Sequence, residues 1–168
     1  MAIAMGMFGL GAAPANAASL QNCKTAKGTL TMSPGLSSTS TSDQKVTIKG
    51  TESGCAPAAK TGGTGQYTSI LTLKKASCAT LVKGGTTFTG NATTKWKNGK
   101  TSTYRVTYKD GTGNNVTKIN MTGTVTKGLF VGKKFSAGFV IAVSGNPNCT
   151  TVKFTKATWK QTKAWIIF

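Results

Sequence analysis

The side chains that most often carry out catalysis are scarce in this sequence. The chain of 168 residues has no histidine, which excludes Ser-His and Cys-His nucleophilic sites. Its three acidic residues are Asp43, Glu52 and Asp110. A carboxylate pair acting as acid and base would have to use them, yet all three fall in stretches that we predict to be loops or turns. Asp110 precedes a glycine and has a sufficient role as a turn former.

Two short motifs resemble those of the Ser/Lys enzymes that recognise penicillin. Residues 42–45 (SDQK) match S-x-x-K, and residues 60–62 (KTG) match K-T-G. In those enzymes S-x-x-K opens a helix within a much larger fold, whereas Lys45 opens a predicted strand here. Residues 99–101 (GKT) end like a phosphate-binding loop, but Gly99 belongs to a predicted hairpin turn. We therefore predict no catalytic residue, no cofactor and no enzymatic activity.

All four cysteines lie after residues 1–17, which we predict below to be an export signal: Cys23, Cys55, Cys78 and Cys149. An even number of cysteines in an exported chain indicates disulfides, here two. The chain has no C-x-x-C pair and no histidine, so a metal site is disfavoured. Four cysteines allow three pairings. We favour Cys55–Cys78 together with Cys23–Cys149, although their spacing does not decide among the three.

The first 17 residues, MAIAMGMFGLGAAPANA, are typical of an export signal. Ala15-Asn16-Ala17 fits the small-x-small cleavage pattern, although the basic residues that usually open such a signal are missing, as they would be if the start were truncated. We predict a signal peptide over residues 1–17 and one domain over residues 18–168. The apolar run is too short for a transmembrane helix, which needs about 20 residues. An apolar N-terminal strand is the alternative.

The charge of the chain is strongly one-sided. Lysine and arginine number 21 against three acids, which gives a net charge of +18, and Arg105 is the one arginine. Such a field attracts polyanions, but it also keeps a protein soluble without any partner. Arginine is the usual choice for bidentate contacts with bases, so a lysine-rich chain disfavours sequence-specific recognition of nucleic acid.

Apolar and polar residues alternate along most of the chain, as in half-buried strands. The alternation is clearest over residues 45–50, 66–74, 86–96, 104–109, 116–126, 134–145 and 151–159. A change of phase in the last of these predicts a bulge near Lys156. Residues 33–43 read as a loop or a weakly ordered strand edge, and Asn98-Gly99 predicts a tight hairpin. We predict an all-β meander of about eight or nine antiparallel strands closing into a barrel, with a two-sheet sandwich as the rival.

The outward face of this sheet is rich in lysine and threonine, and we predict that it binds polyanions. The candidate residues are Lys95, Lys97, Arg105, Lys109, Lys118, Lys133, Lys134, Lys153 and Lys156, and Lys160 and Lys163 add to the same positive surface. The expected partner is an anionic cell-envelope polymer or surface, which would retain the exported protein at the cell wall.

Two other classes of function stay open. In one, the barrel interior carries a small apolar ligand, in a cavity lined by Phe88, Trp96, Tyr104, Tyr108, Met121, Phe135 and Phe139. The competing interpretation is that these side chains pack as a solid core. In the other, residues 163–168 (KAWIIF) pair with a second copy of the chain. The competing interpretation makes them a final strand over the core.

Several stretches resemble a widespread group of small secreted β-rich proteins of actinobacteria, which are largely uncharacterised. The stretches are 28–36 (GTLTMSPGL), 54–55 (GC), 77–78 (SC), 93–104 (TTKWKNGKTSTY) and 123–135 (GTVTKGLFVGKKF). The resemblance implies an exported, disulfide-bonded β domain and supplies no catalytic residue. This chain carries lysine where the group more often has serine, threonine or glycine, so the extra charge is a feature of this protein.

Overall fold

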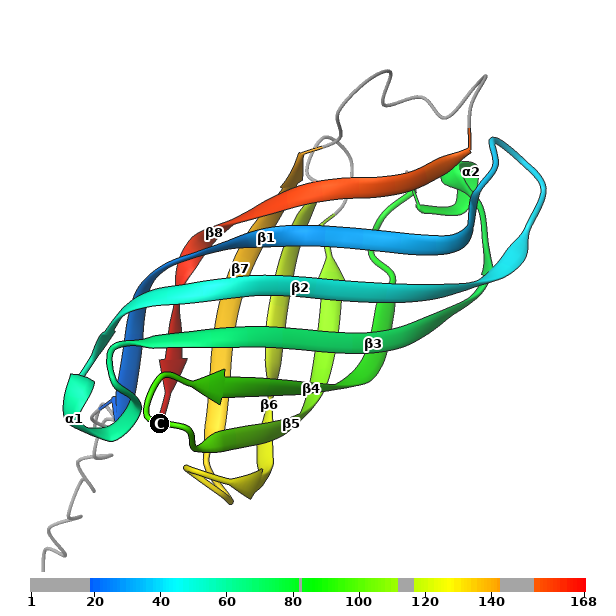
Figure 1. Ribbon diagram of the computed structural model, residues 1–168. Helices are drawn as coiled ribbons and strands as arrows, with labels where there is room; N and C mark the ends of the chain where they lie inside the picture. The colour runs from blue at the N-terminus through cyan, green and yellow to red at the C-terminus, as the bar shows by residue number, and fades with distance from the viewer. Residues whose placement is uncertain (1–18, 82, 112–116, 143–152) are drawn as a thin grey trace, which may run out of the picture.

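The chain folds into a closed barrel of antiparallel strands, seen in a computed structural model that describes residues 19–81, 83–111, 117–142 and 153–168 (Figure 1). Each strand pairs with the next in sequence, and the last pairs with the first. The strands are β1 (Gln21–Leu36), β2 (Ser42–Ala56), β3 (Thr64–Ala76), β4 (Thr87–Trp96), β5 (Thr101–Asp110), β6 (Lys118–Gly128), β7 (Lys134–Ala142) and β8 (Phe154–Ile167). Two single-turn helices, α1 (Ala58–Thr61) and α2 (Cys78–Leu81), connect β2 to β3 and β3 to β4.

This topology confirms the predicted all-β meander and the barrel, and it excludes the sandwich. The barrel closes along the seam between β1 and β8, where Thr29 pairs with Thr158. The ladder between these strands shifts register between Cys23 and Lys27. The Gln161 side chain fills that interruption by donating from its amide nitrogen to the carbonyl oxygens of Cys23 (3.1 Å) and Lys24 (3.3 Å).

A second register shift lies where the phase of the sequence changes. Lys156 pairs with Thr31, whereas Phe154 pairs with Leu36. The irregularity is therefore near Lys156, as predicted, but the additional residues belong to β1. The neighbouring expectation of a loop or a strand edge over residues 33–43 holds in part: residues 37–41 lie outside the strands, while β1 continues to Leu36 and β2 begins at Ser42. The inward positions of β1 include Ala26 and Gly28, whose small side chains weaken the apolar alternation.

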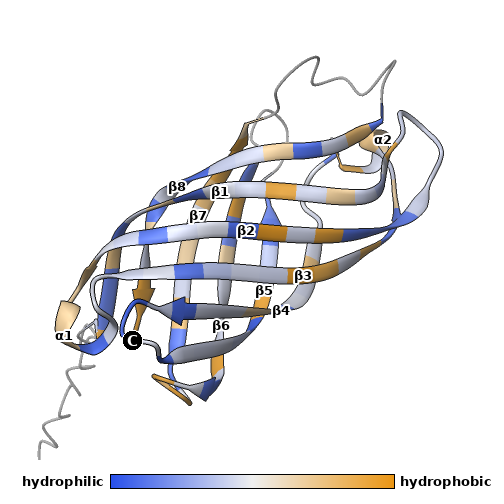
Figure 2. Ribbon diagram, in the orientation of Figure 1, coloured by the Kyte–Doolittle hydropathy of each residue, from blue (hydrophilic) through white to orange (hydrophobic). Residues whose placement is uncertain are grey.

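Alternation places one set of side chains inside the barrel and the other in solvent. Figure 2 shows hydrophilic and hydrophobic residues interleaved along β1, β2 and β3. On β5 the inward residues Tyr104, Val106 and Tyr108 are fully buried. The C-terminal segment follows the same rule, since Trp165 and Ile167 are buried in the barrel as the core interpretation expects.

The turn between β4 and β5 contains the predicted Asn98-Gly99 pair. Gly99 has the positive φ (+83°) that lets the chain reverse tightly. Asn98 stabilises the turn with its side chain, which accepts a hydrogen bond from the Lys100 amide (3.1 Å) and donates one to the Lys60 carbonyl (2.6 Å). The turn is thus tied to α1 as well as to its own strands.

The disulfide in the described part of the chain joins Cys23 and Cys55. The predicted pairings Cys55–Cys78 and Cys23–Cys149 are therefore wrong. Cys23 and Cys55 are direct partners in the β1–β2 register, which brings their side chains to the same face. The sequence did not show the first half of β1, so it could not place Cys23 beside β2. Cys78 is buried at the start of α2, and Cys149 lies outside the described residues, as do residues 1–17 of the predicted signal.

Candidate anion-binding surface

Part of the predicted lysine face is present on three adjacent strands. Lys95 of β4, Arg105 and Lys109 of β5, and Lys118 of β6 are all exposed on the outside of the barrel. In the register Lys109 lies between Thr87 of β4 and Asn120 of β6. Threonine and asparagine thus separate the charges on this face.

The other predicted cations are spread around the barrel. Lys97 lies in the β4–β5 turn, Lys133 and Lys134 lie where β7 begins, and Lys153 and Lys156 lie at the start of β8. All five are exposed. They extend the positive surface, but the structure does not gather them with the β4–β6 lysines into one compact site.

A tighter group of three lysines lies across the barrel seam, and two of them, Lys27 and Lys49, are absent from the predicted set. Lys160 of β8 and Lys27 of β1 are direct cross-strand partners, and Lys49 of β2 pairs with Thr29 of β1. These three lysines surround an open groove of about 620 Å³ whose lining also includes Gln66. We call it the seam groove. The alternation of residues 45–50 already indicates that Lys49 faces outward. Lys27 could not be placed from the sequence, because the first half of β1 was not predicted to be a strand.

The three acidic side chains do not neutralise the seam groove. Asp43 forms an ion pair with Lys74 (2.7 Å) and accepts a hydrogen bond from the Lys75 amide (3.1 Å). The hydrogen bond from Lys74 lowers the pKa of Asp43. Glu52 and Asp110 are buried. The lysines at the groove therefore have no carboxylate side chain beside them.

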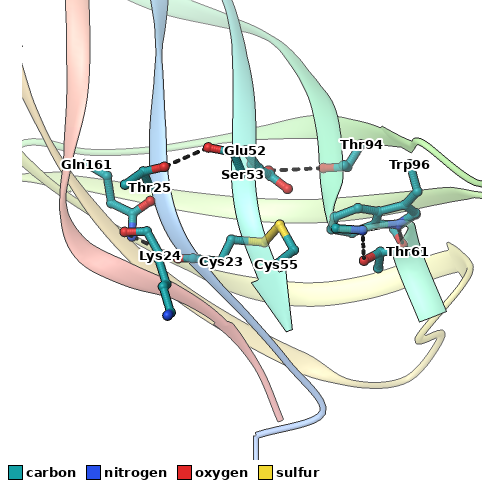
Figure 3. Close-up of a disulfide and its surroundings, with 12 residues drawn as sticks. Cys23, Lys24, Thr25, Glu52, Ser53, Cys55, Thr61, Thr94, Trp96 and Gln161 are labelled. Atoms are coloured by element: carbon teal, nitrogen blue, oxygen red, sulfur yellow. Dashed lines mark hydrogen bonds between the residues drawn. A yellow bond between two sulfur atoms is a disulfide. The ribbon is translucent and has the colours of Figure 1, made fainter. Parts of the chain in front are cut away.

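Glu52 lies inside the barrel, which corrects its prediction as a loop or turn residue (Figure 3). It is the inward residue of β2 that follows Ile48 and Gly50 at spacing two. Thr94 donates a hydrogen bond to one carboxyl oxygen (3.3 Å), and the other oxygen is buried with no protein partner in the described residues. Burial raises the pKa of Glu52 to about 8, so the folded protein holds this carboxyl protonated at neutral pH.

Glu52 also lies beside the disulfide. One carboxyl oxygen and the sulfur atoms of Cys23 and Cys55 lie within 4.8 Å of one another. The two sulfurs are bonded to each other, and a metal would need them as thiolates. In the oxidised protein these three residues are therefore a buried part of the core, and the two sulfur atoms are not available as metal ligands.

The other two acids lie at strand ends, closer to their predicted positions. Asp43 is the second residue of β2, and Asp110 is the last residue of β5. Burial raises the pKa of Asp110. The three carboxyls lie in different surroundings, which gives no support to a working carboxylate pair.

The predicted cavity residues pack against one another and against rings from distant strands. Phe135 contacts Tyr104 with a centroid distance of 4.9 Å and stacks on Trp165 at 5.2 Å. Tyr67 of β3 reaches Trp165 of β8 at 5.0 Å, across the barrel interior. Of the residues predicted for the cavity, Phe88 is partly buried and stacks on Tyr108 with a centroid distance of 5.5 Å. The others are buried: Trp96, Tyr104, Tyr108, Met121, Phe135 and Phe139.

Hydroxyl groups connect the middle of this interior. The hydroxyls of Tyr67 and Tyr108 are 2.8 Å apart, and Tyr108 donates to Ser69 (2.6 Å). These bonds satisfy polar atoms that would otherwise be costly to bury. An eight-stranded barrel is just wide enough for side chains to fill, and these contacts favour a packed core over a ligand cavity.

Comparison of the chain with protein-family models, with curated proteins and with solved structures gives no match. The resemblance to small secreted actinobacterial proteins stays a prediction. Within the described ranges, no helix has the length and apolar character needed to cross a membrane.

Proposed function

We propose that this protein is a non-enzymatic, exported barrel that resides at the cell envelope by binding anionic polymers through its outer lysines. The observation that carries the proposal is the combination of outward lysines on β8, β1, β2 and β4–β6 with acids that are paired or buried elsewhere. Neighbouring strands are about 4.8 Å apart, so lysines on several strands present a positive field that extends around the barrel to a polymer.

Export is supported by the Cys23–Cys55 disulfide, since such bonds persist in oxidising compartments. It is also the natural setting for the signal-like residues 1–17. The envelope of a bacterium supplies acidic polymers outside the cell, where a chain of net charge +18 meets them without competition from cytoplasmic nucleic acid.

The composition of the outer surface sets the mode of binding. Lysine acts as a hydrated point charge and arginine as a rigid fork, and only Arg105 could supply such a fork. Binding by lysine is therefore tuned to charge density and is tolerant of local polymer structure. The same argument makes sequence-specific reading of nucleic acid an unfavourable function for this surface.

Binding to isolated cell-wall polymer, with duplex DNA as comparator, tests the proposal. The mature protein is titrated with each polymer at physiological salt, and affinity is expressed per anionic group. We expect micromolar binding with a preference for the wall polymer. Equal affinity for DNA would show that the surface attracts any polyanion without selectivity. If the protein binds neither polymer, the lysines serve only to keep it soluble.

A further inference from the structure

We propose that the seam groove is a specific binding site for a phosphodiester group of the envelope polymer. The inference rests on the proposed function and deepens it, because it assigns the tightest contact to one place and one ligand chemistry. The groove is the hollow bounded by Lys160 of β8, Lys27 of β1 and Lys49 of β2, with Gln66 of β3 at its margin.

The arrangement of charge at the groove is unfavourable in the free protein. Lys27 and Lys160 are direct partners across the antiparallel ladder, a position in which Cβ atoms are about 5 Å apart and like charges destabilise the sheet. Lys49 lies one strand further, opposite Thr29, which is two residues from Lys27. An anion held between the three ammonium groups would remove this repulsion.

Neutral donors complete the lining. The Thr51 hydroxyl donates to the Gln66 side-chain oxygen (3.2 Å), so the amide nitrogen of Gln66 is the donor end of that side chain. Thr158 and Thr29 face each other in the β1–β8 register, next to the lysine pair. Such groups can donate hydrogen bonds to an oxyanion.

The floor of the groove is held by packing from inside the barrel. Gly28 and Gly50 are direct partners, and a Cβ on Gly50 would overlap the Trp159 ring. The indole nitrogen of Trp159 donates to the Lys49 carbonyl oxygen (3.1 Å), and its ring contacts Phe139 at 5.5 Å. The backbone that carries Lys49 is therefore fixed from within, which reduces the ordering cost of binding.

The identity of the cations selects the anion. Arginine makes bidentate contacts to carboxylate and phosphate alike, whereas lysine binds phosphate as a point charge and needs no planar partner. Lysines from three different strands line the groove, an arrangement that suits a tetrahedral oxyanion better than a planar one. The occupant we assign is accordingly a phosphodiester of an envelope polymer, in preference to a uronic acid carboxylate.

Two variants with equal loss of charge test this site. The groove variant is Lys27→Gln/Lys49→Gln/Lys160→Gln, and the control variant is Lys95→Gln/Lys109→Gln/Lys118→Gln on β4–β6. Thermal unfolding first shows that both variants fold. Both variants and the unmodified protein are then titrated with poly(glycerol phosphate), with polygalacturonate of equal charge and with duplex DNA.

We expect the groove variant to lose at least about tenfold in affinity for poly(glycerol phosphate) and the control variant about threefold or less. Amide NMR shifts should concentrate at residues 27–29, 49–51 and 158–160. Equal losses in the two variants would overturn the groove and leave the diffuse surface standing. Equally tight binding of polygalacturonate would overturn the phosphodiester assignment, and equally tight binding of DNA would overturn the envelope polymer as occupant. If the unmodified protein binds none of the three, the proposed function itself fails.

Discussion

Lys27 and Lys160 are direct cross-strand partners at the seam where the last strand of the barrel closes on the first. No acidic side chain relieves them, since Asp43 pairs with Lys74 and the other two acids are buried. Like charges at such positions cost stability. The same repulsion is a reason for an anion to bind there, so the seam links the stability of the fold to its proposed function.

Replacing one member of this pair should stabilise the free protein. We expect Lys160→Gln to raise the free energy of unfolding by about 0.2–1 kcal/mol at low salt and to weaken polymer binding. Urea unfolding at low and high salt measures the change, which should shrink as salt screens the charges. Lys95→Gln is the control, because Lys95 faces Thr101 across the β4–β5 ladder. A loss of stability in Lys160→Gln at low salt would contradict the claim that Lys27 and Lys160 repel each other across the seam.

The buried carboxyl of Glu52 should make stability depend on pH. Its pKa is about 8 in the folded protein and 4.5 as the ordinary value, so the folded state holds a proton that the unfolded state releases between these values. The free energy of unfolding should therefore fall as pH rises from about 4.5 to about 8, by at most about 1.4 kcal/mol per pH unit, and then level off. Thermal or urea unfolding from pH 4 to 9 measures this slope.

Glu52→Gln keeps the shape of the side chain and the acceptor for Thr94 but cannot ionise. We expect it to flatten the slope between pH 4.5 and 8 and to raise the unfolding temperature at pH 8. Asp43→Asn is the matched control, because the lowered pKa of Asp43 acts in the opposite sense and only at acidic pH. If Glu52→Gln keeps the slope of the unmodified protein, the carboxyl is not held protonated in the fold.

Two inward glycines allow neighbouring strands to approach closely. A Cβ on Gly123 would overlap the backbone oxygen of Arg105, and a Cβ on Gly28 would overlap that of Lys49. We expect Gly123→Ala to destabilise the barrel by about 1–3 kcal/mol or more, as overpacking does. Gly138→Ala is the control, because its nearest contact is the flexible Lys163 side chain at 3.1 Å. Equal unfolding midpoints for the two variants in urea would show that the strands around Gly123 shift enough to accommodate the added methyl group.

Disulfide mapping of the oxidised protein should recover a peptide pair joined by Cys23 and Cys55. With that bond formed, Cys78 and Cys149 remain for the second predicted disulfide. Cys23→Ala/Cys55→Ala should lower the free energy of unfolding by about 2–4 kcal/mol. Recovery of a Cys55–Cys78 peptide pair from freshly folded protein would contradict the β1–β2 register.

The sequence predicted the fold better than it predicted the site. Period-two alternation identified β3 to β7 and the first half of β8, since most of their inward residues are large, as with Tyr104 and Phe135. It failed for β1, whose inward positions include Ala26 and Gly28, and it stopped β2 at Gly50. Both errors had consequences, because the missing strand carries Cys23 and Lys27, and the shortened strand hid Glu52.

Contacts between strands distant in sequence could not be read from alternation. The pairing of Lys27 with Lys160 depends on closure of the barrel and on a shift in register between β1 and β8. The Tyr67–Trp165 contact depends on the radius of the barrel, which sets the reach of side chains across the interior. The sequence therefore predicted a positive outer face, while the structure is needed to find where its charges converge.

The salt dependence of binding tests the central claim most directly. The affinity of the mature protein for isolated envelope polymer is measured from about 50 to 200 mM salt, the range over which several ionic contacts produce a large change. We predict that log K falls linearly with log salt, with a slope steeper than about −3, as expected if at least four anionic groups are neutralised. Binding that does not weaken with salt, or no binding even at the lowest salt, would contradict attraction through the lysine surface.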